Sequence, residues 1–261
     1  MRRELPEGLA LSLDEIAGFP EAVIGRMAPI QTEAMKDGDP LRISVEKYAF
    51  LPVDKAAFRG DAPSVEGLCT LDRFEYYVKR KLYVHNLGHA AVAYLGLLKG
   101  CTYIAEAVDD ADILFLAAGA MRESAAALAM ENAGDAANLG RHIDNLLYRF
   151  SNRALGDTCA RVAADPARKL SQGDRLVGAL ENCEKYGLPA VYIAAAVAAA
   201  LPALGFPGAA SLEEITGLSP DGQHYRAIMA FWETVSGADA GGAAAALRRA
   251  AGRLAGDITI L

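Results

Sequence analysis

The segment Lys81-Leu-Tyr-Val-His85-Asn86-Leu-Gly88-His89 carries an amine, an amide and two imidazoles within nine residues. In an α-helix each residue turns the chain by ~100°, so Lys81, His85 and His89 line one stripe with Asn86 at its edge. These groups suit proton abstraction from a hydroxyl. A lysine whose pKa is lowered by burial can act as general base, and Asn and neutral His can donate hydrogen bonds to the developing alkoxide. Gly88 leaves a gap in side-chain cover through which a ligand could approach His89.

Two other interpretations of this segment stay open on residue types alone. Lys81 can lie on a solvated helix face while the two histidines sit at the edge of a core. His85 and His89, four residues apart, could instead bind a metal ion, but no carboxylate or third histidine stands nearby at ligand spacing. We therefore predict no metal site.

The elements that must position this segment are mostly helical. Apolar residues make up 52% and charged residues 23% of the chain, which favours a folded core. We predict an irregular stretch over residues 1–40 with one short helix near Ser12–Ala17, one or two short strands within 41–55, and a loop over 60–67. From residue 70 onward the spacing of apolar residues predicts helices over 71–98, 104–107, 110–132, 136–150, 157–164, 173–186, 190–204, 211–216, 223–236 and 239–254.

This order of elements predicts one mainly α domain over residues 1–261, with 1–70 irregular and 71–261 helical. Strands and helices do not alternate along the chain, which argues against a doubly wound parallel sheet. The sequence also has no GxGxxG after a strand, no phosphate-binding loop and no HExxH. We therefore expect no Rossmann domain and no dinucleotide site within these residues.

The net charge of −7 argues against a nucleic-acid partner, which would need a basic face. An anionic ligand would have to be held by a local group of cations. Arg168, Lys169 and Arg175 supply three cations within eight residues. They can be exposed charges on the first turn of a helix capped by Asp174, or they can bind a phosphate or carboxylate.

The cysteines, the N-terminal residues and the interrupted apolar stretch at 188–205 together predict a cytoplasmic protein. The four cysteines form no CxxC pair and are expected to be reduced: Cys69, Cys101, Cys159 and Cys183. The N-terminal Met-Arg-Arg-Glu-Leu-Pro does not resemble a signal peptide. Two prolines and Gly205 interrupt the apolar residues 188–205, which favours a buried helix over a membrane span.

At Lys81, Asn86 and His89 the sequence resembles the polyol-specific long-chain dehydrogenase family, which includes mannitol-1-phosphate 5-dehydrogenase, mannitol 2-dehydrogenase and the hexuronate reductases. The family motif is a lysine, an asparagine five residues later and a histidine three residues after that. The resemblance implies that Lys81 is the general base or acid, that Asn86 and His89 polarise the substrate oxygen, and that no zinc is required. It also implies a helical substrate domain like the C-terminal domain of 6-phosphogluconate dehydrogenase.

Further segments extend the resemblance over residues 18–205 and point to the phosphate-specific branch. They include Arg149-Phe150 followed by Asn152 and Asp157, and Arg168-Lys169-Leu-Ser-Gln-Gly-Asp174-Arg175-Leu. The resemblance implies that Arg168, Lys169 and Arg175 contact a sugar phosphate or a sugar acid such as altronate. It implies NAD as hydride acceptor, bound mainly by a Rossmann domain supplied in cis or in trans.

Two departures from the family limit this interpretation. The Rossmann domain is missing from these residues, and Gly25 in Ile24-Gly25-Arg26 stands where the family has the aspartate of Val-Asp-Arg. Gly25 thus removes a carboxylate that could orient a substrate hydroxyl. We predict the substrate-binding and catalytic domain of an NAD-dependent polyol dehydrogenase, incomplete alone. The alternative is a non-catalytic sugar-phosphate-binding or regulatory paralogue, and the oligomeric state is not predicted.

Overall fold

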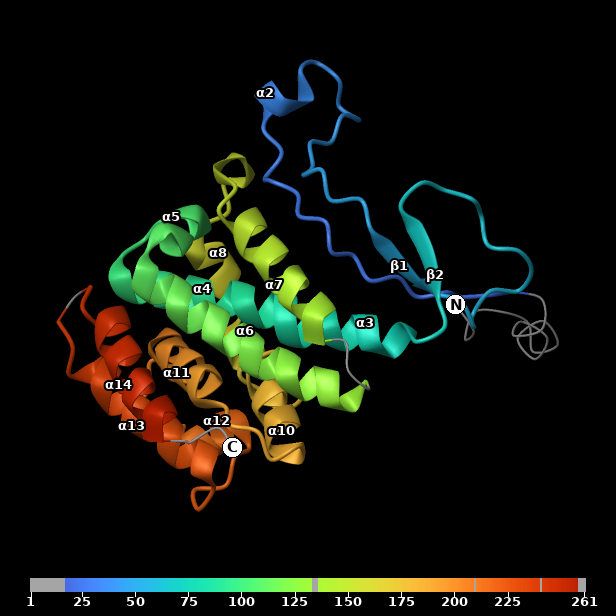
Figure 1. Cartoon of the computed structure of the whole chain (residues 1–261). Coiled ribbons are helices and arrows are strands. Elements are labelled where there is room, and N and C mark those ends of the chain that lie inside the picture. The colour runs from blue at the N-terminus through green and yellow to red at the C-terminus, as the bar shows by residue number, and fades with distance from the viewer. Residues whose placement is uncertain (1–16, 133–135, 209, 240, 258–261) are drawn as a thin grey trace. The chain divides into compact units, whose positions relative to one another are not determined.

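A computed structural model, shown in Figure 1, describes residues 17–132, 136–208, 210–239 and 241–257 of the chain. The chain divides into two compact units, Met1–Lys81 and Leu82–Leu261, which we describe separately. The short helix expected near Ser12–Ala17 lies, apart from its last residue, outside the described residues.

The first unit holds a short helix and a two-stranded parallel sheet. Helix α2 spans Glu33–Lys36, and the Thr32 hydroxyl caps it by accepting a hydrogen bond from the Met35 amide. Strand β1, Leu51–Asp54, pairs in parallel with β2, Leu68–Leu71. Strand β1 confirms the small β-element predicted near the N-terminus. Strand β2 corrects the expectation of loop and helix there, since four residues without alternating polarity carry no readable period.

The helix predicted over residues 71–98 is divided into three consecutive pieces. Helix α3 spans Phe74–Arg80, a π-helical turn covers Lys81–Asn86, and α4 continues over Leu87–Lys99. The boundary between the two units falls at the start of the π-helical turn. Helix α4 ends at Gly100, whose left-handed φ of 80° lets its amide bond back to the carbonyls of Gly96 and Leu97.

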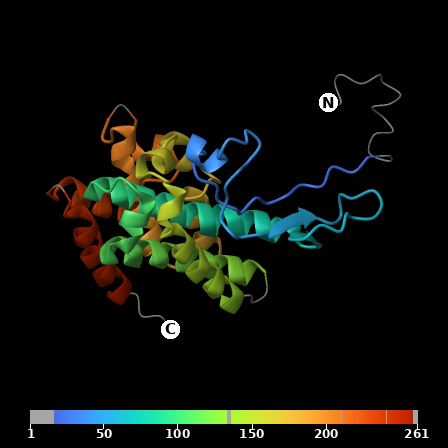
Figure 2. The same cartoon turned by 90° about the horizontal axis from the view of Figure 1, so that it is seen from above.

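Three helices form the centre of the second unit. Helices α4, α6 (Ala111–Glu131) and α11 (Val191–Ala200) contact one another. Figure 1 labels them, and Figure 2 gives the same cartoon from above. In α11 every residue except Tyr192 is buried, which a run rich in alanine permits because small side chains let neighbouring helices come close. Helix α6 is long and apolar enough by composition to cross a membrane, yet its buried residues pack within this unit.

The remaining helices surround this centre and confirm the predicted mainly α fold. Helix α7 packs on α6, α8 on α4, and α13 and α14 on α11. Their bounds are α5 Ile104–Asp109, α7 Ala136–Phe150, α8 Cys159–Ala163, α9 Pro166–Lys169, α10 Val177–Lys185, α12 Leu212–Thr216, α13 Gln223–Ser236 and α14 Ala243–Asp257. Short 3-10 turns cover Arg153–Leu155 and Leu201–Leu204.

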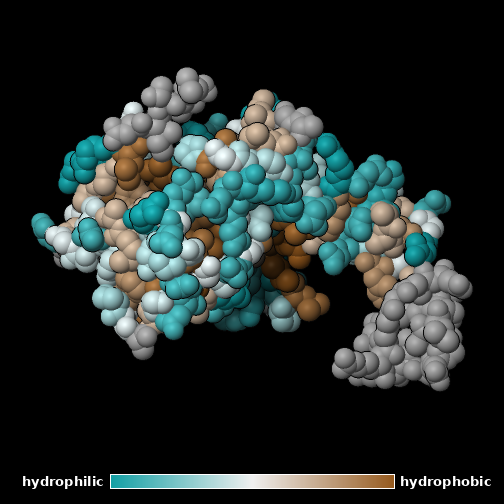
Figure 3. All heavy atoms as spheres, turned by 90° about the horizontal axis from the view of Figure 1, so that it is seen from below, coloured by the Kyte–Doolittle hydropathy of each residue, from teal (hydrophilic) through white to brown (hydrophobic). Residues whose placement is uncertain are grey.

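Several details of this unit differ from the expectation. Helix α9 was not predicted, because its four residues are too few to show a period, although Pro166 at its first position is a typical helix start. Helix α14 begins at Ala243 rather than 239, because Gly241 adopts a φ of 87°. The cysteines, by contrast, agree with the expectation: all four, including Cys69 of the first unit, are free thiols. Figure 3 shows one face of the surface, where hydrophobic residues lie among hydrophilic ones.

Candidate active site on helix α4

The π-helical turn changes how the predicted catalytic residues are aligned. A π-helix bonds each amide to the carbonyl five residues back, so Lys81 and Asn86 come nearer to one face than the ~140° separation of an α-helix. Lys81, Asn86 and His89 are half-buried, whereas His85 is buried. The partly accessible set is therefore Lys81, Asn86 and His89, while the side chain of His85 is buried. Single π-turns of this kind occur frequently at functional sites.

His89 is held at one ring nitrogen by a carboxylate. Its Nε2 lies 3.2 Å from Oδ2 of Asp157, in the segment that leads into α8. The other carboxylate oxygen, Oδ1, accepts hydrogen bonds from Arg161. Burial raises the pKa of Asp157, but hydrogen bonds and charge from His89 and Arg161 outweigh it and hold that pKa below its usual range. Asp157 is therefore a carboxylate when it meets His89.

An aromatic ring fixes the plane of the same imidazole. Phe150, the last residue of α7, stacks on His89 with ring centroids 4.8 Å apart, and it also lies 5.8 Å from His85. Both imidazoles thus face an apolar ring. Among the residues that the structure describes, no group of three His, Cys, Asp or Glu side chains is placed to bind a metal ion.

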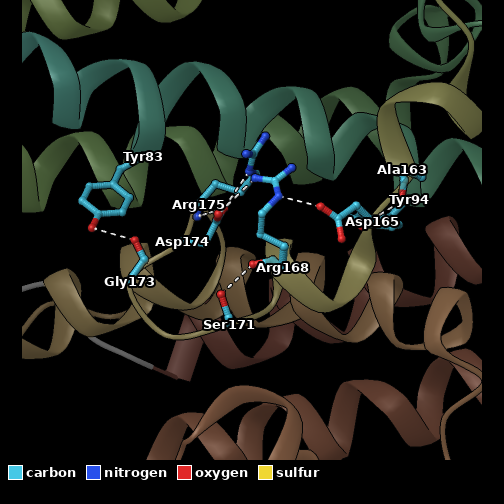
Figure 4. A network of polar contacts seen from close by, with 9 residues as sticks. All are labelled: Tyr83, Tyr94, Ala163, Asp165, Arg168, Ser171, Gly173, Asp174 and Arg175. Atoms are coloured by element: carbon cyan, nitrogen blue, oxygen red, sulfur yellow. Dashed lines mark hydrogen bonds and ion pairs between the residues drawn. The ribbon is translucent and has the colours of Figure 1, made fainter. Parts of the chain in front are cut away.

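The predicted cation cluster is built on α9 and the turn after it, and ion pairs connect its members (Figure 4). Arg168 pairs with Asp165 at 2.6 Å and with Asp174 at 3.3 Å. Arg175 pairs with Asp174 at 2.7 Å. Burial raises the pKa of Asp174, but hydrogen bonds and charge from Arg175, together with the charge of Arg168, bring it below its usual value. The two guanidinium groups therefore share one ionised carboxylate.

Lys169 differs from its two neighbours because its side chain is buried. Its residue is only 6% exposed, and no hydrogen bond or ion pair to another described residue reaches its ammonium group. Burial lowers the pKa of Lys169, and the positive charges of Arg175 and Arg168 lower it further. An anion would relieve the repulsion among these three cations.

Two tyrosines tie the cation segment to the helix that carries His89. The Tyr83 hydroxyl donates to the Gly173 carbonyl at 3.2 Å, and the Tyr94 hydroxyl donates to the Ala163 carbonyl at 3.1 Å. Residues 163–173 therefore run along the side of the helix between positions 83 and 94, and Figure 4 shows both tyrosines flanking the cluster. His89 lies between these two attachment points in the sequence. The structure thus brings the predicted cation segment beside the predicted catalytic helix.

Gly88 does not leave the open gap expected beside His89. A β-carbon at Gly88 would lie 2.4 Å from the Met121 sulfur of α6, so Met121 already fills that space. The sequence shows that Gly88 has no side chain, but it does not show that Met121 occupies the space beside it. Gly88 serves the close approach of α4 and α6.

Gly25, the departure noted in the sequence, belongs to the first unit. A β-carbon there would lie 3.2 Å from Cε1 of Tyr48, whose ring covers the position. Gly25 and Tyr48 help to line a cavity of about 330 Å³ in this unit, together with residues 24, 26, 49–51 and 65–68. An aspartate at position 25 would require Tyr48 to move.

Sequence reasoning missed two residues of the site. Asp157 and Phe150 were quoted as parts of a motif, and neither was predicted to touch His89. Their positions in the chain are far from residue 89, so no local spacing reveals the contact. A carboxylate two residues before the first residue of a short helix was the available signal, and it indicates a helix cap as readily as a histidine partner.

The described residues do not build a nucleotide site. Their sheet has two strands, and no glycine-rich loop leads from a strand into a long helix, which is the arrangement that binds a dinucleotide pyrophosphate. The described residues therefore do not form a binding site for NAD by themselves.

Comparison with known families finds one family model that matches residues 73–202, described as the mannitol dehydrogenase C-terminal domain. A mannitol-1-phosphate 5-dehydrogenase from Brevibacillus brevis is 38% identical over 197 residues, which is 76% of this chain and 50% of the relative. The chain thus spans about half the length of this curated relative. The matched residues include Lys81, Asn86, His89, Asp157 and the cation cluster within 73–202.

Two solved structures share the fold at low sequence identity. A substrate-free D-sorbitol dehydrogenase superposes with a TM-score of 0.72 at 17% identity, covering 92% of this chain and 56% of the other. A Pseudomonas fluorescens mannitol 2-dehydrogenase, solved with NAD and D-mannitol, gives a TM-score of 0.58 at 22% identity, covering 96% of this chain and 54% of the other. At these identities the likeness concerns the fold.

Proposed function

The chain belongs to the mannitol dehydrogenase family through its C-terminal domain, residues 73–202, and from this we propose that residues 1–261 form the substrate-binding and catalytic part of an NAD-dependent polyol dehydrogenase. The observation that carries the proposal is the placement of the cations at 168–175 along the helix that bears Asn86 and His89. A proton-handling group and an anion-binding group are what a phosphorylated polyol needs.

Each side chain then has one task. Lys81 takes the proton from the substrate hydroxyl as general base, and the Asn86 amide donates a hydrogen bond to the resulting alkoxide. His89 contributes a second polar contact to the same oxygen. Lys169, with Arg168 and Arg175, binds the anionic end of a hexitol phosphate or sugar acid. NAD, the hydride acceptor, is bound mainly by a nucleotide-binding domain outside these residues, in cis or in trans.

Lys169 is the first anchor for the anion in this proposal. The guanidinium groups of Arg168 and Arg175 already pair with Asp165 and Asp174, so an incoming phosphate competes with carboxylates for them. Lys169 is buried, and the charges of Asp165 and Asp174 act on it less than those of Arg175 and Arg168. The ligand is a small molecule, the protein is cytoplasmic with reduced thiols, and neither nucleic acid nor membrane is a partner.

The test supplies a nucleotide-binding domain. The portion of the Brevibacillus brevis enzyme that this chain does not cover, added as a second chain or fused, should restore NADH-dependent reduction of fructose 6-phosphate. Lys81→Ala should lower that activity by at least ~100-fold. Lys99→Ala, which removes an ion pair with Asp110 at the far end of α4, is the matched control and should stay near the parent rate. Equal activity of Lys81→Ala and the parent would contradict the assignment of the base.

A second candidate function is favoured by Gly25 and the absence of a nucleotide site in the described residues. A non-catalytic sugar-phosphate-binding or regulatory paralogue would keep the anion site without turnover. Calorimetric titration with mannitol 1-phosphate in the absence of NAD separates the two. Binding combined with no turnover in the reconstituted pair favours the paralogue, and no binding to any polyol phosphate or aldonate contradicts both.

A further inference from the structure

The residues before β1 fold back on themselves as a long hairpin within the first unit. Residues 22–31 form one arm and residues 43–50 the other, and α2 lies at the turn between them (Figure 1). The Glu46 amide donates to the Met27 carbonyl at 3.3 Å, and the Met27 amide donates to Oε1 of Glu46 at 2.6 Å. The second arm leads into β1, which pairs antiparallel with the start of the first arm. The two arms therefore lie side by side in opposite directions.

Exposure alternates along both arms of this hairpin. The even-numbered residues 24–30 and the odd-numbered residues 43–49 are exposed, and the residues between them are half-buried. A β-carbon at Gly25 would lie 3.2 Å from the Tyr48 ring, so the half-buried positions of the two arms point to the same side. Because successive side chains of an extended chain point to opposite sides, the exposed positions of both arms share the other side. We call that side the outer face.

The outer face is apolar at its centre. It carries six apolar side chains and two cations: Ile24, Ala28, Ile30, Ile43, Val45 and Ala49, with Arg26 and Lys47. Ile24 is 69%, Ile43 68% and Ile30 65% exposed. A contiguous group of large apolar side chains in water, with charges beside it, is typical of a surface that another protein covers.

The hairpin also lacks a core of its own. Between residues 17 and 73, all of which the structure describes, only Pro52 and Val53 are buried. Ordering so long a stretch of backbone costs far more free energy than the burial of two side chains returns. A two-stranded sheet adds little, because sheets of this size are marginal in water. The hairpin therefore needs a partner that buries its outer face.

We propose that the outer face is the docking surface for the nucleotide-binding domain, an inference that rests on the proposed function. The chain spans 50% of the Brevibacillus brevis relative, so about as much of that protein again lies outside the match. Parallel strands such as β1 and β2 occur almost only within larger sheets that other elements cover on both faces. A dinucleotide-binding domain is built on a sheet of that kind. The two cations favour a partner surface with acidic residues around its apolar contact.

Hydrogen–deuterium exchange tests the docking on the full chain, alone and fused to the portion of the Brevibacillus brevis enzyme that it does not cover. The amides of residues 24–30 and 43–49 should exchange quickly in the chain alone and at least ~10-fold more slowly in the fusion. Protection already present in the chain alone would show that a second copy, or another part of this chain, covers the outer face, and would overturn the docking. Equal exchange in the two proteins would overturn it as well.

Two variants place a carboxylate in the apolar centre of the outer face. Ile30→Asp and Val45→Asp should each abolish the protection seen in the fusion, because an unpaired charge is costly to bury. Tyr148→Asp, at an exposed residue of α7, is the matched control and should keep the protection. All three positions are exposed, so each variant of the chain alone should keep the circular dichroism spectrum of the parent. Full protection in both outer-face variants would contradict the docking, and the comparison of parent chain and parent fusion stands without any variant.

Docking and catalysis are separated by the same fusion. A fusion that is protected at the outer face but does not reduce fructose 6-phosphate with NADH contradicts the proposed function and leaves the docking intact. An active fusion whose outer face exchanges as quickly as in the chain alone contradicts the docking and leaves the proposed function intact.

Discussion

The ring of Phe150 lies almost parallel to the ring of His89, at 14° between their planes, and it is itself only 2% exposed. One residue of α7 thereby packs the core and orients the imidazole. Removing the Phe150 ring should therefore lower both the stability and the activity of the protein.

Phe150→Ala should lower the free energy of unfolding by ~3–5 kcal/mol, because it opens a cavity at the end of α7. Chemical denaturation of the full chain measures the change. Tyr148→Ala, at a residue 77% exposed on the same helix, should stay within ~0.5 kcal/mol of the parent. Similar losses for the two variants would show that Phe150 does not pack as described.

Glu123 predicts a pH dependence of stability. Its Oε2 accepts hydrogen bonds from the amides of Tyr192 and Ile193 and so caps α11. Burial raises the pKa of Glu123 from 4.5 to about 7, against the opposing effect of these hydrogen bonds. Between those two values the folded chain keeps a proton that the unfolded chain loses, so stability falls as the pH rises, by up to about 3 kcal/mol.

Glu123→Gln should remove this loss, because the amide oxygen still accepts from the helix amides and does not ionise. Thermal unfolding at pH 5 and at pH 8 should show the variant gaining on the parent as the pH rises. Glu213→Gln, at an exposed residue of α12, is the control. A constant difference between Glu123→Gln and the parent across this range would contradict the raised pKa.

Lys169→Met should separate stability from substrate binding. Methionine keeps an unbranched stem and removes a buried cation, so the variant should be at least as stable as the parent. If Lys169 anchors the anion, KM for a phosphorylated substrate should rise ~10-fold or more, with kcat little changed. Kinetics of the reconstituted enzyme test this, with Lys185→Met, an exposed lysine paired to Glu131, as control. An unchanged KM would remove Lys169 from the anion site.

Gly88→Ala should destabilise the chain by ~1–3 kcal/mol, since its β-carbon meets Met121. The double variant Gly88→Ala/Met121→Ala should be less destabilised than the sum of the two single variants. The reason is that the cavity left by Met121→Ala accommodates the methyl group added by Gly88→Ala. Gly140→Ala is the matched control: it lies in α7 with no atom within 4 Å of a β-carbon and should stabilise by ~0.5–1 kcal/mol. Free energies of unfolding of the parent, the two single variants, the double variant and the control decide the question.

Periodicity predicted the long elements well and the short ones badly. Helices α7 and α13 have the bounds expected from their apolar spacing, Ala136–Phe150 and Gln223–Ser236. Strand β2 and helix α9, with four residues each, show too little of any period to be read. The π-helical turn at Lys81–Asn86 escaped because it uses the same residue types as an α-helix and differs only in its hydrogen bonds.

The sequence predicted the residues of the candidate site that lie close together in the chain. It did not predict the contacts that depend on the packing of distant helices. Residue types and spacing singled out Lys81, His85 and His89 with Asn86 at the edge. The family resemblance then selected Lys81, Asn86 and His89, whose roles remain predictions. The burial of Lys169 and the attachment of residues 163–173 to Tyr83 and Tyr94 depend on how distant helices pack. The same is true of the carboxylate that contacts His89, because Asp157 lies in the segment between α7 and α8.

Helix α11 has consequences for how this unit can be divided. A segment buried on nearly every side cannot hold its shape until α4, α6, α13 and α14 surround it, and these neighbours come from both ends of the unit. Cutting the chain anywhere between α4 and α14 would leave each piece with an uncovered alanine-rich surface. A chain truncated before residue 223 should therefore be insoluble. Two pieces made by cutting this unit should become soluble only when they are expressed together.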